Sequence, residues 1–204
     1  SITSADAILV LRSAVRLITL GVIQQILGDV NEDGRINAGD AVLILRKAVG
    51  LIPKVVVGTW SSPKVAWGVP ERTADGEVVM PLWLEGEIYG GDFVVRYDKE
   101  MGKPARIRTI GENAVWAMNT DTPGEFRFTV ASMEPLRRVD LVLESGGEAA
   151  ETGLWSLEET LVVDGSGRSI EVDLSSVKTG LSALPDRYVL LQNYPNPFNP
   201  ETHI

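Results

Sequence analysis

Apolar side chains follow two different patterns along this chain, and the change comes near residue 53. Before it they recur every three or four residues, which is the spacing of one face of a helix. Two stripes carry this spacing: Ile8, Leu11, Val15 and Ile18, then Val42, Leu45, Val49 and Ile52. We predict helices over residues 5–17 and 41–49, with further helical character over residues 19–27. The stripes are expected to pack against each other rather than to line an open groove.

From residue 54 onward, apolar and polar residues alternate over short runs, which is typical of strands with one buried face. Six runs predict strands: residues 78–84, 93–97, 126–130, 139–143, 157–163 and 169–172. Turn signals separate them, at residues 74–76, 90–92, 122–124, 145–147 and 164–167. Many short strands with this spacing predict a β-sandwich over residues 54–178, with Phe93, Val95 and Tyr97 on one face of their strand.

Between the helical stretches lies a polar loop, GDVNEDGRINAGD, which spans residues 28–40. Counted from its second residue, oxygen-bearing side chains stand at positions one, three, five, nine and twelve: Asp29, Asn31, Asp33, Asn37 and Asp40. Calcium loops take ligands from these positions, with a backbone carbonyl at position seven, here Arg35, and glycine at position six, here Gly34. A polar turn is the alternative. The spacing favours calcium, and magnesium suits the loop less because it demands stricter octahedral geometry.

The loop–helix unit occurs twice, because residues 1–18 repeat residues 35–52. Asp6 matches Asp40 in this alignment, and both stand at the start of a predicted helix, where a carboxylate caps free amides. An internal repeat of one unit is a stronger signal than a lone motif. The first copy keeps only Thr3 and Asp6 as side-chain ligands, so we expect one calcium ion rather than two.

A loop followed at once by a helix, with Asp rather than Glu at position twelve, and present in duplicate, resembles the dockerin family of bacterial calcium-binding modules. No regular helix–loop–helix of the EF-hand kind can be recognised around it. The resemblance implies a cohesin-type protein partner, in another chain or in this one. It also implies that loop positions ten and eleven and basic residues of the next helix face that partner: Ser4, Ala5, Ala38 and Gly39, with Arg12, Arg46 and Lys47. A solvated face is the alternative for the three basic side chains.

The predicted sandwich resembles, more weakly, the cohesin fold. The segments that carry this resemblance are GEVVMPLWLEG at residues 76–86 and GGDFVVRYDKE at residues 90–100. A fibronectin-like or immunoglobulin-like sandwich is the alternative. The expected architecture is therefore multidomain: a small all-α dockerin-like module over residues 1–53 and an all-β sandwich over residues 54–178.

Five tryptophans are many for this length. Trp83 alternates with Leu82 and Leu84 along its strand, which predicts a place outside the core. An exposed indole can stack on a sugar ring, so a carbohydrate-binding module is the alternative function. Core or interface packing is the simpler explanation of the tryptophans.

The tail LPDRYVLLQNYPNPFNPETHI, residues 184–204, resembles the opening of the C-terminal sorting domain of the type IX secretion system. A Pro- and Asn-rich linker is the alternative. Residues 179–204 are expected to form a linker and the start of this domain, with the joint at residues 175–183. The resemblance implies a secreted or cell-surface bacterial protein.

Composition limits the possible functions. The chain lacks cysteine and has His203 as its single histidine, which argues against a catalytic triad. It carries 28 acidic against 19 basic side chains without a basic run, which argues against nucleic-acid binding. The neighbouring Glu158 and Glu159 would point to opposite faces of a strand, which disfavours a glycosidase pair. Arg12 and Arg16 interrupt the most apolar stretch, residues 7–27, so no membrane span is expected.

A chain that starts with Ser1 reads as an internal fragment. We expect non-catalytic, calcium-dependent protein attachment linked to polysaccharide degradation.

Overall fold

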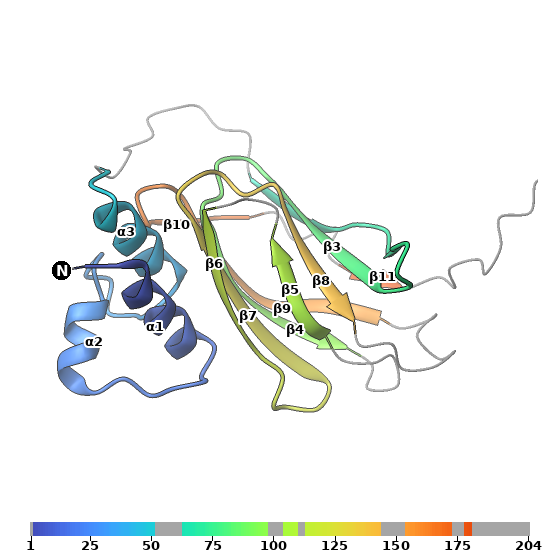
Figure 1. Cartoon of the computed structure of the whole chain (residues 1–204), viewed down its shortest axis with the longest axis horizontal. Helices are drawn as coiled ribbons and strands as arrows, with labels where there is room; N and C mark the ends of the chain where they lie inside the picture. The colour runs from blue at the N-terminus through green and yellow to red at the C-terminus, as the bar shows by residue number, and fades with distance from the viewer. Residues whose placement is uncertain are drawn as a thin grey trace, which may run out of the picture.

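The structure, a computed structural model, describes residues 2–51, 63–97, 104–109, 113–143, 154–172 and 178–180. Within these residues, two antiparallel sheets form a sandwich, and two of the three helices lie against the outside of one sheet (Figure 1). The sheet without helices, called the opposite sheet here, has the order β1-β3-β8-β5, with β2 beside β3. Its strands are β1 (Lys64–Trp67), β2 (Glu71–Arg72), β3 (Val78–Glu85), β5 (Pro104–Thr109) and β8 (Arg138–Leu143).

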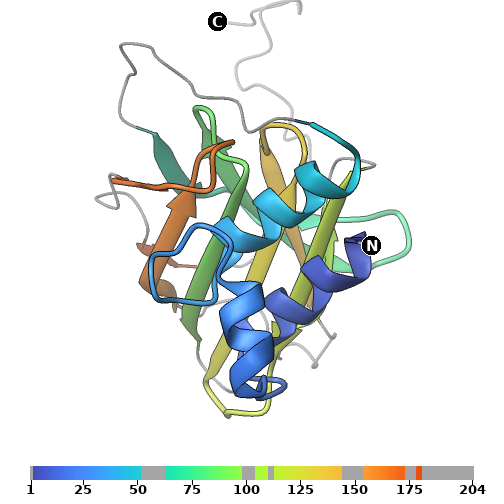
Figure 2. The same cartoon turned by 90° about the vertical axis from the view of Figure 1, so that its left-hand side faces the viewer.

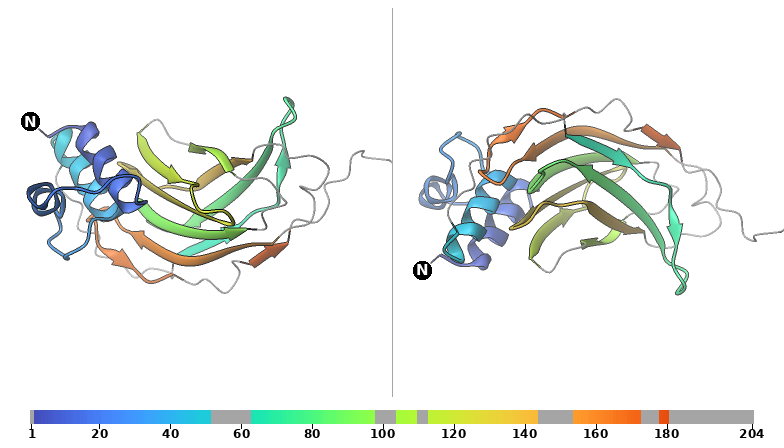
Figure 3. Two further views of the ribbon diagram at one scale, coloured as in Figure 1. Left: turned by 90° about the horizontal axis from the view of Figure 1, so that it is seen from below. Right: turned by 90° about the horizontal axis from the view of Figure 1, so that it is seen from above.

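The second sheet, called the helix-covered sheet here, has the order β10-β9-β4-β7-β6, with β11 beside β9. Its strands are β4 (Gly90–Tyr97), β6 (Ala114–Asn119), β7 (Glu125–Ser132), β9 (Leu154–Val163), β10 (Ser169–Ile170) and β11 (Lys178–Gly180). Figure 3 shows the two curved sheets one above the other, with the helices at one side. The predicted all-β sandwich is therefore present.

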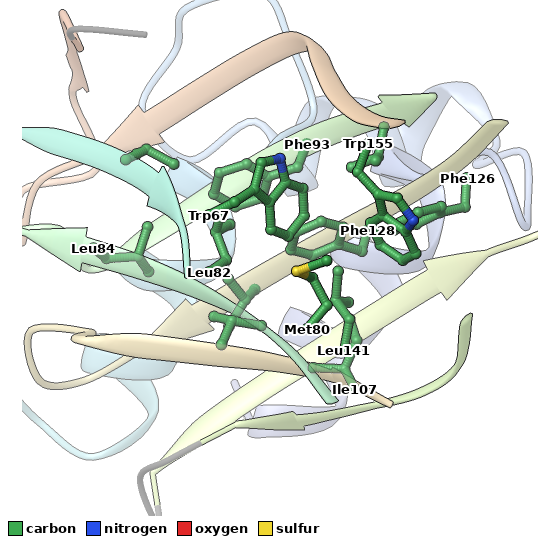
Figure 4. Close-up of a cluster of buried hydrophobic side chains, with 14 of the residues drawn as sticks. Trp67, Met80, Leu82, Leu84, Phe93, Ile107, Phe126, Phe128, Leu141 and Trp155 are labelled. Carbon is green, nitrogen blue, oxygen red and sulfur yellow. The ribbon is translucent and has the colours of Figure 1, made fainter. Parts of the chain in front are cut away.

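The core lies between the sheets, where alternate residues of facing strands meet (Figure 4). The rings of Trp67 and Trp155 pack edge to face with centroids 5.5 Å apart, and those of Phe93 and Phe128 stack at 4.6 Å. Such aromatic pairs contribute about 0.5–1.5 kcal/mol beyond their buried area. Phe93 and Val95 point inward as their alternation predicts.

All six predicted strands are present, although the last is a strand only over Ser169–Ile170. The prediction of a turn at residues 90–92 is wrong, because these residues open β4. Residue 90 is a glycine for a different reason. A Cβ atom there would stand 2.9 Å from the carbonyl oxygen of Val130 and 3.1 Å from Cγ2 of Val42, which belongs to the helix Ala38–Ala48. The turn predicted at residues 145–147 lies outside the described residues.

The strands that sequence patterning missed include three at sheet edges, β1, β5 and β6. Edge strands are half-exposed, so their alternation is weak. Strand β11 falls inside the segment expected to be a joint, and it pairs with β9 through Lys178, Thr179 and Gly180. The sandwich therefore reaches at least Gly180, beyond its expected end.

The helices are α1 (Ser4–Ala14), α2 (Val22–Gly28) and α3 (Ala38–Ala48). α1 ends before the predicted residue 17, and α3 begins before the predicted residue 41. α2 confirms the helical character predicted over residues 19–27, and it stands directly before the polar loop. Among the described residues, no helix is long and apolar enough to cross a membrane.

The two copies of the repeat begin in the same way. In the first, the Asp6 carboxylate accepts from the backbone N–H of Thr3 at 2.8 Å. In the second, Asp40 accepts from the backbone N–H of Asn37 at 3.0 Å. Each carboxylate thus satisfies an amide at the start of its helix, as the sequence predicts.

The two copies also end in the same way. Leu17 N donates to Arg12 O at 2.9 Å, and Leu51 N donates to Arg46 O at 2.8 Å, which closes the last turn of α1 and α3. The residue before each leucine has a left-handed backbone: Arg16 with φ 64° and Gly50 with φ 75°. The repeat is therefore structural as well as sequential, and only the second copy has the glycine that this conformation favours.

The buried helix faces differ from the predicted stripes. The buried apolar residues are Ala7, Val10, Leu11 and Val15 in and after α1, and Ala41, Val42, Ile44 and Leu45 in α3. Ile8 and Val49 are exposed, contrary to the prediction, and Ile52 lies outside the described residues. The predicted mutual packing is only half of the arrangement, because the same faces also contact the helix-covered sheet.

Candidate docking interface and metal loop

The helices α1 and α3 lie across the outer face of the helix-covered sheet, as Figure 2 shows from the helix side. Sheet residues that join their apolar cluster include Tyr89, just before β4, with Ala117, Ala131 and Val163. Alanines and a glycine on this face leave room for the helices to approach closely. One apolar cluster thus spans residues 7 to 163 and joins the two predicted modules.

The closest approach is between two glycines. A Cβ atom on Gly39 would overlap the carbonyl oxygen of Gly167, because the two atoms would lie much closer than the 3.4 Å at which ordinary van der Waals contact begins. A Cβ atom on Gly167 would stand 2.8 Å from the Gly39 carbonyl oxygen. The Asn31 side-chain amide also donates to Gly167 O at 3.1 Å. The start of α3 and the turn before β10 therefore meet backbone to backbone, which explains the glycine at loop position eleven.

A half-buried carboxylate of the sheet faces the start of α3. Asp92 on β4 accepts from the backbone N–H of Ala38 at 3.2 Å and from the hydroxyl of Thr129. The N–H groups of a first helical turn have no partner within the helix, and the helix dipole favours a negative charge there. Burial raises the pKa of Asp92 to about 6, against the lowering effect of these two hydrogen bonds.

Two further polar contacts hold the ends of the helices. Arg46 of α3 donates to Met133 O at 3.3 Å and places its guanidinium 5.5 Å from the ring centroid of Tyr89. Asn119 of β6 donates to the Val15 carbonyl at the end of α1, at 3.0 Å. Together with Asp92, they fix the register of both helices on the sheet.

The predicted partner-facing residues divide into two groups. Ala38, Gly39 and Arg46 lie at the contact with the sheet. Ser4, Ala5, Arg12 and Lys47 are exposed to solvent. Asp92 and Asn119 of the sheet, and Gly167 of the turn before β10, were not predicted to take part in this contact. Asp92 lies within β4, beside the inward-pointing Phe93, and no local signal distinguishes it from other outward polar positions.

The predicted calcium loop is closed by its own side chains. Asp29 accepts from the N–H groups of Asp33 and Gly34, at 3.1 and 2.9 Å. Asp33 accepts from Arg35 N at 2.8 Å. The amide nitrogens of Asn31 and Asn37 both lie near the second oxygen of Asp33, at 3.0 and 3.2 Å. The polar ends of the Asn31, Asp33 and Asn37 side chains therefore converge on one point.

Asp40 lies at the base of this loop and is fully buried. Its carboxylate accepts from Val30 N at 2.7 Å, Asn31 N at 3.2 Å and Asn37 N at 3.0 Å. Burial, with a smaller contribution from the nearby charge of Asp29, raises its pKa to about 6 against the lowering effect of these three hydrogen bonds. Among the described ion pairs, none involves Asp29, Asp33 or Asp40.

These residues fit a hard cation by their chemistry. The Asn31 oxygen already lies in the loop, 3.0 Å from Asp33 N, and a turn of the Asn37 amide would place a further oxygen beside Asp33, which gives an all-oxygen donor set. As the side chains stand, no group of three or more Asp, Glu or His among the described residues is arranged to hold a metal. In the first copy, Thr3 and Asp6 are exposed and bond to each other through the hydroxyl at 3.0 Å.

Trp83 lies outside the core, as predicted, and is 42% exposed on the opposite sheet. The Arg138 guanidinium sits 5.0 Å from its ring centroid. Arg138 in turn bonds to Asp140 at 2.5 Å and to Glu71 at 2.9 Å. Trp116 is similarly exposed, Trp67 and Trp155 are in the core, and Trp60 lies outside the described residues.

No family model matches the chain, and no curated protein matches it. Solved structures that resemble it include a cohesin module from a family 33 glycoside hydrolase of Clostridium perfringens, with TM-score 0.48 and 19% identity over 60% of this chain and 98% of that one. Another is a type I cohesin–dockerin complex from Clostridium thermocellum, with TM-score 0.47 and 14% identity over 61% of this chain and 100% of the matched chain. A third is a non-cellulosomal cohesin from the archaeon Archaeoglobus fulgidus, with TM-score 0.44 and 10% identity over 59% of this chain and 89% of that one. Similarity this low does not assign a function.

Proposed function

We propose that this chain is a non-catalytic, calcium-dependent attachment unit of the dockerin–cohesin type. Residues 2–51 act as the ligand and the helix-covered sheet acts as the receptor. The observation that carries the proposal is the contact between α1, α3 and this sheet, which combines an apolar cluster with partly buried polar pairs. An apolar centre with paired polar groups is the anatomy of a specific protein interface.

The contact within one chain implies a choice between partners. The contact faces of α1 and α3 and the outer face of the helix-covered sheet each cover the other within the same chain. Short linkers give the tethered partner an effective concentration in the millimolar range. An external cohesin-type domain must therefore compete with the sheet of this chain for the same helices.

Calcium enters the proposal through the loop. Asp29, Asn31, Asp33, Asn37 and Asp40, with the Arg35 carbonyl, would hold one ion, which supplies positive charge among three carboxylates. The loop residues also set the position of Ala38 and Gly39, which meet the sheet at once after the loop. A loop that opens without calcium would move the start of α3 and weaken docking.

A cleavable chain tests this function. A site for a specific protease is inserted after Lys54, the folded chain is cut, and the two pieces are passed through a size-exclusion column. We expect them to elute together in about 1 mM calcium, the range in which extracellular calcium modules bind, and to separate in chelator. Separation in calcium would refute the proposal.

Matched loop variants show whether the loop itself carries the calcium effect. Asp29→Ala should separate the cut pieces even in calcium, because it removes a ligand from the second loop. Asp6→Ala is the control, because its carboxylate is exposed and belongs to the incomplete first loop. If both variants behave alike, the loop is not the site of calcium action.

The biological setting is a separate part of the proposal. We place the chain in a secreted or cell-surface bacterial protein that takes part in polysaccharide degradation, on the resemblances stated above. Residues 181–204, which carry the sorting-domain resemblance, lie outside the described residues. A fusion that carries this tail with a completed sorting domain should reach the surface of a host with type IX machinery. Surface delivery that is the same without the tail would remove this support.

A second candidate function is sugar binding on the opposite sheet, supported by the exposure of Trp83 beside Arg138, Asp140 and Glu71. Arg138 already occupies part of the space over the indole ring, so the docking function is better supported. Retention of the chain on an insoluble polysaccharide should be lost in Trp83→Ala and kept in Trp116→Ala, whose indole is 39% exposed. Retention that survives Trp83→Ala would exclude this site.

A further inference from the structure

Helix α2 presents its apolar side to solvent. Val22, Ile23, Ile26 and Leu27 are 74%, 75%, 70% and 73% exposed. Residues at these spacings fall on one side of a helix, so they form one continuous patch rather than scattered positions. Figures 1 and 3 place α2 on the side of α1 and α3 that faces away from the sandwich.

The polar side chains of α2 hold it in this orientation. Gln25 donates to Leu20 O at 2.9 Å, and Gln24 accepts from Gly21 N at 3.0 Å. Both glutamines thus cap the start of their own helix. An amphipathic helix normally turns its apolar side inward, so this arrangement leaves apolar surface that another body would cover.

The patch continues into a hollow of about 400 Å³ between the three helices. Its apolar wall includes Ile2, Leu9, Leu20, Leu27 and Ile44. Asp6, Gln24 and Lys47 stand among the lining residues as its polar members. We call α2 and this hollow the α2 face. The exposed side chains of α2, with Ile2 and Leu9 at 43% and 41% exposure, give the α2 face an apolar patch of roughly a few hundred Å², the size that often marks a protein contact.

Charge selects the kind of partner. Residues 17–28, LITLGVIQQILG, contain no charged side chain, whereas the whole chain carries a net charge of −9. A membrane surface would favour a rim of Lys and Arg around an apolar helix, which this segment lacks. A sugar would favour aromatic side chains, which it also lacks. The α2 face is therefore suited to another apolar protein surface.

We propose that the α2 face is a two-fold contact between two copies of this chain. A symmetric contact sets the same patch against itself, so each copy provides both the aliphatic side chains and the hollow that receives them. Residues 17–28 bring no charge to the contact between two acidic chains, and the charged residues that line the hollow, Asp6 and Lys47, have opposite signs. This contact lies on the other side of the helices from the helix-covered sheet, so a dimer keeps both docking contacts intact.

Light scattering on the full chain, coupled to size exclusion, tests the proposal. We expect a monomer–dimer equilibrium between about 1 and 100 µM. The double variant Ile23→Lys, Ile26→Lys should weaken dimerisation by at least about tenfold, because it buries charge in an apolar contact. Val69→Lys is the matched control, because Val69 is 77% exposed on the sandwich. Circular dichroism checks that each variant remains folded.

Crosslinking provides a second readout, because the chain has no cysteine of its own. Ile26→Cys should give a disulfide-linked dimer on mild oxidation, whereas Val69→Cys should not. A chain that stays monomeric over the whole range would overturn the proposal and would leave a different protein or another part of the full protein as the cover. A dimer that survives the double lysine variant would also overturn it and would indicate exchange of the helices between chains.

Discussion

The contact between Gly39 and Gly167 makes a sharp prediction, because a single methyl group should reverse the usual effect of a helix substitution. Gly39 lies in the first turn of α3. Replacing a helical glycine with alanine normally stabilises by up to about 1 kcal/mol. Here the added methyl would overlap the Gly167 carbonyl oxygen and stand 2.9 Å from Oδ1 of Asn37. Neither atom is the end of a flexible aliphatic chain, so the helix itself must move.

A shift of about 1 Å would break the neighbouring hydrogen bonds, which already span 3.1 Å from Asn31 to Gly167 and 3.2 Å from Ala38 to Asp92. The first bond contributes about 1 kcal/mol, and the second about 1.5–3 kcal/mol because its acceptor is charged. After subtracting the helix gain of about 1 kcal/mol, we expect Gly39→Ala to destabilise the docked form by about 2 kcal/mol.

Two measurements check this value. Urea unfolding of the full chain in calcium should show the loss of about 2 kcal/mol, and the protease-cut chain should dissociate about thirtyfold more readily. Gly28→Ala is the control, because its methyl would meet Cδ1 of Ile36 at 3.3 Å, the end of a flexible side chain. If Gly39→Ala is as stable as the parent and stays docked, the reasoning from this close contact is wrong.

Three further predictions follow from single residues. Calorimetry should show one calcium ion per chain, with binding lost in Asp29→Ala and unchanged in Asp6→Ala. Because burial raises the pKa of both Asp92 and Asp40 to about 6, the folded state holds two protons at low pH that the unfolded state releases. Each carboxyl should make unfolding in chelator cost about 1 kcal/mol more at pH 5 than at pH 7, and Asp92→Asn should remove about half of the total gain. Arg16→Gly should stabilise the chain by up to about 1 kcal/mol in thermal unfolding, because Arg16 has the left-handed backbone that Gly50 adopts in the second repeat, whereas Arg16→Ala should not.

The sequence by itself determined the features that depend on neighbours along the chain. The repeat of residues 1–18 in residues 35–52 predicted two helices with matching caps, and both are present. Alternation predicted the inner strands of the sandwich, because strands buried between others must place one face in the core. The loop spacing placed Asp29, Asn31 and Asp33 together, and their side chains do converge. The calcium ion itself stays a prediction.

The tertiary structure decided the features that depend on residues distant in sequence. The buried sides of α1 and α3 differ from the predicted stripes because each helix contacts both its partner helix and the sheet. Gly90 resembles a turn signal in sequence, but it makes room for Val42 of α3. Asp92 and Gly167 belong to the docking contact only because folding brings β4 and the turn before β10 to the start of α3. Local patterns record which residues can be buried, whereas the contacts that select among them form only when the chain closes on itself.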